Sequence, residues 1–130
     1  MLLLDTHVWW WSLTEPERLS ATVIKTIKQT KPYQRAIASI SIWEFAMMAV
    51  KKRIELKISA SKWLFRAIHD TGLRVIELSP EIAVESCSLP GDFHKDPADR
   101  IIVATARVHN LSLLTKDRKI LDYPNVKAVW

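Results

Sequence analysis

Residues 94–114 read HKDPADRIIVATARVHNLSLL, and this stretch decides the predicted fold class. Asp96 suits the N-cap of a helix, and Pro97 suits its first helical position. Apolar residues then recur at helical spacing, which predicts a helix over 97–109. The short apolar run 111–114 follows directly and is typical of a buried strand. A helix succeeded at once by a buried strand indicates an α/β fold.

The rest of the chain alternates in the same way. Further strands are predicted at 2–4, 36–40, 74–79 and 126–130, and further helices at 16–30, 42–52, 59–70, from Pro80 onward and at 117–121. Buried strands separated by helices favour a mostly parallel sheet with helices on both faces. A chain of 130 residues without linkers or repeats is expected to form a single domain, residues 1–130.

Composition narrows the classes of function. Only two glycines occur, Gly72 and Gly91, so a glycine-rich phosphate loop is excluded. The single cysteine, Cys87, indicates a reducing compartment. No apolar run is long enough to span a membrane, and the first residues lack the pattern of a signal peptide. The expected location is therefore the cytoplasm.

Four acids stand where the predicted strands end or the following helices begin. They are Asp5, Glu44, Asp99 and Asp117. Because the carboxyl ends of parallel strands share one edge of a sheet, these acids are expected to converge there. Clustered carboxylates repel one another, and a divalent cation that prefers oxygen ligands removes that cost. The pattern therefore predicts a Mg²⁺ or Mn²⁺ site, and the four histidines show no spacing that favours zinc.

Each acid also has a simpler interpretation as a helix cap. Residues 41–44 (SIWE) have the form of a capping box, and residues 96–99 (DPAD) resemble one. Asp5 and Asp117 are equally suited to cap the turns that follow them. Ser41 and Thr115 are candidates to orient metal ligands or a substrate phosphate, although capping and turn formation explain them as well.

Basic residues concentrate in the segment 25–74, which holds eleven Lys or Arg residues against three acids. Such a segment is suited to contact a nucleic-acid backbone, and it is equally typical of solvated helix faces. The candidates for phosphate contacts are Lys51, Lys52, Arg53, Lys57, Lys62 and Arg66.

Six tryptophans also need a place in the fold. Trp9, Trp10 and Trp11 are consecutive, so they are not expected all to face one core, and one of them is expected at an interface. Trp43 and Trp63 fall on apolar helix faces and are predicted to lie in the core.

Four segments of the chain resemble the PIN-domain family, and in particular its VapC-type toxins. They are residues 2–9 (LLLDTHVW), 39–44 (SISIWE), 94–106 (HKDPADRIIVATA) and 113–117 (LLTKD). The resemblance implies a three-layer α/β/α sandwich, a metal-dependent endoribonuclease acting on RNA, a homodimer, and inhibition by a cognate antitoxin. It also implies that Asp5, Glu44, Asp99 and Asp117 are the catalytic, metal-binding acids. Asp96 falls in the third segment as well, but it has the stronger capping interpretation.

Two other functions remain open from the sequence. A PIN-like module that binds nucleic acid or a partner without cutting would have no need for the complete set of acids. A phosphoacceptor receiver domain would use an acidic Mg²⁺ pocket and a late lysine, here Lys116. Receivers, however, need paired acids after the first strand, where this chain has only Asp5.

Overall fold

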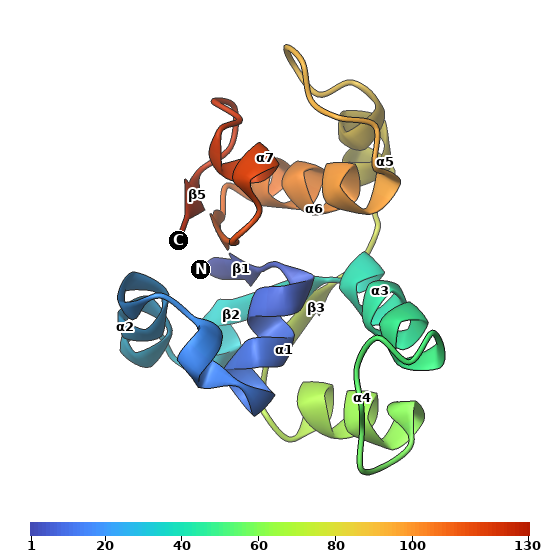
Figure 1. Cartoon of the computed structure of the whole chain (residues 1–130). Coiled ribbons are helices and arrows are strands. Elements are labelled where there is room, and N and C mark those ends of the chain that lie inside the picture. Colours follow the sequence, from blue (N-terminus) through green and yellow to red (C-terminus); the bar gives the residue numbers. More distant parts are fainter.

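Five parallel strands form the centre of the molecule in the order β3-β2-β1-β4-β5 (Figure 1). The computed structural model describes residues 1–130. The strands are β1 (Leu2–Leu4), β2 (Arg35–Ala38), β3 (Arg74–Ile76), β4 (Ser112–Leu114) and β5 (Ala128–Val129). All four pairings between neighbouring strands are parallel, which confirms the predicted sheet.

Helices cover both faces of the sheet, as Figure 1 shows, with α1 to α4 on one side and α5 to α7 on the other. The first group is α1 (Thr6–Thr14), α2 (Ala21–Gln29), α3 (Ser39–Val50) and α4 (Ala60–His69). The second is α5 (Pro80–Cys87), α6 (Pro97–Val108) and α7 (Arg118–Leu121). Two short 3₁₀ turns, η1 (Pro16–Arg18) and η2 (Pro32–Gln34), complete the chain. The three-layer α/β/α arrangement is therefore as predicted.

The strands divide the core into two halves because successive side chains point to opposite faces of a sheet. Leu2 and Leu4 of β1 pack with α1 to α4, whereas Leu3 packs with α6 and α7. Ile37 of β2 faces the first half, and its neighbours face the second. Most residues of the three central strands β1, β2 and β4 are buried, whereas the edge strands β3 and β5 are partly exposed, and this burial explains the apolar runs in the central strands.

The order of the strands reverses between β1 and β4. The chain first moves outward from β1 through β2 to β3, and it then returns to place β4 on the other side of β1. Loops that leave the carboxyl ends of two such strands diverge to opposite faces, so the sheet opens into a crevice at this point. Asp5 follows β1, and residues 115–117 follow β4, directly at this crevice.

Helix α1 (Thr6–Thr14) is not predicted by the sequence pattern. Its residues are apolar on almost every side, so the pattern lacks a helical period. The predicted helix 16–30 is also divided, because Ser20 caps a new helix by accepting a hydrogen bond from the Val23 N–H at 3.1 Å.

Helix α3 begins three residues earlier than predicted, and β2 ends at Ala38 rather than at residue 40. The interpretation of residues 41–44 as a capping box is therefore wrong. Ser41 lies inside the helix and is fully buried. Its side chain serves a contact with α1 instead of a cap.

The tryptophans divide differently from the prediction. Trp43 is 57% exposed, because the buried face of α3 runs through Ser41, Phe45 and Met48 and leaves position 43 outside it. Trp63 is half-buried and stacks on the Phe45 ring with centroids 4.1 Å apart. Two of the three consecutive tryptophans, Trp9 and Trp11, are buried, and Trp10 is partly exposed.

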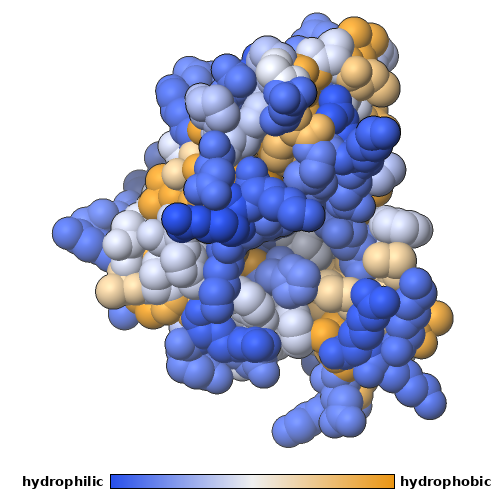
Figure 2. All heavy atoms as spheres, turned by 45° about the horizontal axis from the view of Figure 1, so that its top comes forward, coloured by the Kyte–Doolittle hydropathy of each residue, from blue (hydrophilic) through white to orange (hydrophobic).

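One face of the molecule is largely polar. Figure 2 shows one face on which hydrophilic residues predominate and hydrophobic residues form small separate patches. No helix has the length and apolar character needed to cross a membrane.

Two aromatic positions of α3 should respond very differently to truncation. Phe45→Ala removes a fully buried ring packed between Trp9 and Trp63, so the free energy of unfolding should fall by roughly 3–5 kcal/mol. Trp43→Ala removes an exposed ring and should change the free energy of unfolding by about 0.5 kcal/mol or less. Urea denaturation of both variants measures the difference, and equal losses would contradict the placement of α3.

Candidate active site

Asp5 is held rigidly at the end of β1. Its Oδ1 accepts a hydrogen bond from the Thr6 N–H at 2.8 Å and so caps α1. Its Oδ2 accepts a hydrogen bond of 2.6 Å from the Thr115 hydroxyl, across the crevice between β1 and β4. The carboxylate is almost completely buried, so these two donors fix its orientation.

Glu44 reaches the same region from α3. The Thr6 hydroxyl donates to Glu44 Oε1 at 2.7 Å and lies 2.9 Å from Ser41 Oγ. Thr6 and Ser41 are buried, and together they join the start of α1 to the first turns of α3. The role of Thr6 was not predicted from the sequence, where only its position next to Asp5 pointed to the site.

Asp99 and Asp117 come from the starts of α6 and α7. Asp96 caps α6 by accepting a hydrogen bond from the Asp99 N–H at 3.0 Å, which confirms its capping role. Asp117 caps α7 through the Lys119 N–H at 2.9 Å. The Asp117 N–H in turn donates to the Thr115 hydroxyl at 3.0 Å, so Thr115 links two of the acids.

One surface pocket of about 430 Å³ brings the four predicted acids together. Its lining consists of Asp5, His7, Trp11, Glu44, Asp99, Lys116 and Asp117. Asp96, which is exposed, does not line the pocket, and neither do the basic residues around the end of α3. Larger hollows occur elsewhere on the surface, but neither gathers these carboxylates.

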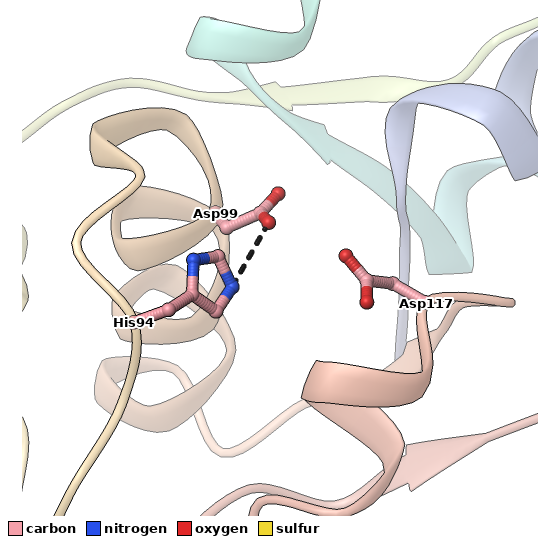
Figure 3. A group of neighbouring side chains, drawn as sticks. All are labelled: His94, Asp99 and Asp117. Carbon is pink, nitrogen blue, oxygen red and sulfur yellow. Dashed lines mark ion pairs between the residues drawn. The ribbon is translucent and has the colours of Figure 1, made fainter.

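His94 lies near the acids in the sequence, and the structure places its ring beside Asp99. Its Nε2 lies 3.1 Å from Asp99 Oδ2, a pair in ion-pair range that lacks the geometry of a hydrogen bond. Figure 3 shows the His94 ring and the Asp99 and Asp117 carboxylates pointing toward one another from three different segments. One ligand atom from each lies within 4.8 Å of the others. The loop before α6 brings His94 back beside the helix, and no ligand spacing in the sequence reveals that return.

The environment of the pocket disfavours the ionised form of three of these acids. Burial is the larger cause and the nearby Asp5, Asp117, Asp96 and Glu44 carboxylates act in the same direction, and together they raise the pKa of Asp99 to about 8. Burial also raises the pKa of Asp5 and of Glu44, although hydrogen bonds from Thr115 and Thr6 oppose the rise. A bound cation would relieve both burial and repulsion.

The donor set fits a hard divalent cation. Every acid offers carboxylate oxygen, and the two imidazoles nearby, His7 in the pocket lining and His94 beside Asp99, do not form a group of nitrogen and sulfur ligands. Residues from four segments contribute, so the site exists only in the folded chain. The arrangement is suited to hold a cation against a negatively charged substrate.

Comparison with known proteins assigns the chain to a family. A family model described as the PIN domain matches residues 2–126. The chain belongs to the PIN-domain family. This assignment separates it from receiver domains and confirms the resemblance seen in the four sequence segments.

One relative of this PIN domain is named as a ribonuclease. The chain is 37% identical over 131 residues to Ribonuclease VapC22 of Mycobacterium tuberculosis, covering 99% of the chain and 98% of that protein. The match is therefore full-length.

Solved structures share the fold at lower identity. A toxin–antitoxin complex from Klebsiella pneumoniae has a TM-score of 0.70 at 22% identity and covers 100% of this chain and 97% of that one. FitAcB from Neisseria gonorrhoeae has a TM-score of 0.73 at 18% identity, with coverages of 100% and 97%. DNA-bound VapBC from Salmonella typhimurium has a TM-score of 0.72 at 16% identity, with coverages of 99% and 98%.

The raised pKa of Asp99 predicts how the stability of the metal-free PIN domain depends on pH. Between the ordinary pKa of 3.8 and about 8, the folded chain holds a proton that the unfolded chain has released. The free energy of unfolding must therefore fall as the pH rises through this window. Asp99→Asn removes the titrating group, so its Tm should exceed that of the unaltered protein by a margin that grows from about pH 5 to about pH 8.

Thermal melts in EDTA at several pH values measure that margin. Asp122→Asn is the control, because Asp122 is exposed directly after α7 and its pairing with Arg118 is a surface contact. A margin that stays constant or shrinks with pH would contradict the account of Asp99.

Proposed function

We propose that this chain is a metal-dependent endoribonuclease that hydrolyses RNA phosphodiester bonds and is the toxin of a type II toxin–antitoxin pair. The convergence of four carboxylates in one pocket carries the proposal. The full-length relationship to a named ribonuclease supports RNA as the substrate class.

The proposed metal is Mg²⁺ or Mn²⁺, held by the carboxylates of Asp5, Glu44, Asp99 and Asp117. When bound, such an ion activates water and stabilises charge on the phosphate. Thr115 keeps Asp5 Oδ2 in place, and Thr6 does the same for Glu44. Ser41 supports Thr6 from inside α3. These hydroxyl groups prearrange the acids, so binding requires little reorganisation.

RNA would approach over the basic residues of the loop that follows α3. Lys51, Lys52, Arg53 and Lys57 are all exposed there, and Lys62 and Arg66 continue the charge along α4. Contacts from such side chains to phosphates give affinity without sequence selection. Raising the salt concentration should therefore weaken RNA binding through counterion release.

A cognate antitoxin and a second copy of the chain are the proposed protein partners, and the cytoplasm is the proposed location. Two of the similar solved structures are described as toxin–antitoxin or VapBC assemblies, which supports the first partner. Exposed apolar residues on α3 and α4, among them Trp43, Val50 and Phe65, provide surface for protein contacts.

Cleavage of RNA tests the proposed activity directly. The protein should cut single-stranded RNA with Mg²⁺ or Mn²⁺ and stop in EDTA. Asp5→Asn and Asp99→Asn should each reduce kcat/KM by about 100-fold or more, since a metal supplies several kcal/mol to the transition state. Asp122→Asn, a surface acid outside the pocket, should cleave normally. Cleavage that survives both active-site substitutions would overturn the site, and binding without cleavage would favour a non-catalytic module.

Thr115 tests whether the hydrogen-bonded support matters for metal binding. Thr115→Val keeps the shape of the side chain but removes the donor to Asp5 and the acceptor for the Asp117 N–H. Mn²⁺ affinity measured by calorimetry should fall by about 10–100-fold.

Thr105→Val is the matched control for Thr115→Val. Thr105 is an equally buried threonine whose hydroxyl bonds only to the Ile101 carbonyl within α6. Its substitution should leave Mn²⁺ affinity unchanged. Equal effects at the two positions would contradict a specific role for Thr115.

A further inference from the structure

Lys116 is the one lysine or arginine among the residues that line the acidic pocket. We infer that its ammonium binds a non-bridging oxygen of the RNA phosphate that enters the pocket. This inference rests on the proposed function and adds a substrate contact to it. The basic residues of the loop after α3 are a separate group, since none of them lines the pocket.

The backbone fixes Lys116 beside the acids. It stands between Thr115, which bonds to Asp5, and Asp117, which caps α7. The Thr115 N–H donates to the Val129 carbonyl at 3.1 Å, and the Asp117 N–H donates to the Thr115 hydroxyl at 3.0 Å. These bonds fix the backbone on both sides of Lys116, and its side chain lies at the rim of the pocket.

The ammonium is near the acids but is paired with none of them. Lys116 is exposed and takes part in none of the four ion pairs of the molecule. Its Nζ lies instead over two indole rings, 5.8 Å from the Trp11 centroid and 5.7 Å from the Trp130 centroid. Rings at this distance attract a cation modestly and leave its hydrogen-bond donors free. The two tryptophans therefore hold the charge at the rim without neutralising it.

A cation in this position meets a need that the acids create. Four carboxylates repel an incoming phosphodiester, and that repulsion is strongest where the substrate must come closest. A lysine ammonium is a compact point charge that suits a single phosphate oxygen. A lysine that neutralises the carboxylates would be expected to form an ion pair with one of them, and Lys116 forms none.

Binding of RNA and of Mn²⁺ to three variants separates these roles. Lys116→Met removes the charge, and Lys116→Arg retains it. Lys119→Met removes an equal charge from an exposed position of α7 that does not line the pocket. The RNA probe is a fluorescent single-stranded oligoribonucleotide of mixed sequence, measured by anisotropy with Ca²⁺ in place of Mn²⁺. Mn²⁺ affinity is measured by calorimetry without RNA.

Lys116→Met should weaken RNA binding by about tenfold, as expected for loss of one charge-assisted hydrogen bond. It should also lower the slope of log K against log salt by about 1. Lys116→Arg should recover most of the affinity, and Lys119→Met should stay close to the unaltered protein. Mn²⁺ affinity should be unchanged or tighter in Lys116→Met, because a positive charge has been removed beside the cation.

Equal RNA affinities for Lys116→Met and Lys119→Met would overturn the inference. So would weaker Mn²⁺ binding by Lys116→Met, which would indicate that the lysine only supports the fold of the pocket. Absence of RNA cleavage by the unaltered protein would contradict the proposed function alone, since the binding measurement does not depend on cleavage.

Discussion

The parallel pairing of β1 with β4 is the contact on which the rest of the site depends. It joins the first strand of the chain to a strand more than a hundred residues later, with Leu4 beside Leu114. The Asp5 N–H continues the pairing by donating to the Leu114 carbonyl at 3.0 Å, and the bond from Thr115 to Asp5 follows directly. Because the strand order reverses here, two loops open around the same point. The acids at the ends of these strands meet as a consequence.

Meeting at that point has an electrostatic cost. Half-buried carboxylates that face one another hold protons at pH values where they would normally be ionised, as the raised pKa of Asp99 indicates. The fold offsets part of the cost with donors, from Thr6 and Thr115, rather than with lysine or arginine ion pairs. A divalent cation would offset the rest of this electrostatic cost. Carboxylates already paired with lysine or arginine would bind such a cation more weakly.

The sequence was sufficient for the layers of the fold and for the four acids, because both follow from apolar runs and from residues at strand ends. It was insufficient for contacts made across the fold. Ser41 fitted a capping box locally, yet packing against Thr6 placed it inside α3. Trp43 was misplaced because an almost wholly apolar helix has no clear period. The approach of His94 to Asp99 depends on the path of a loop, which no local pattern encodes.

A crystal structure grown with Mn²⁺ and recorded at the manganese absorption edge would show whether the four carboxylates form one cation site. We expect an anomalous peak in the pocket, with carboxylate oxygens of Asp5, Asp99 and Asp117 at about 2.2 Å from the ion. Glu44 should contact the ion directly or through water. A pocket without an anomalous peak, or manganese bound only elsewhere on the surface, would contradict the account.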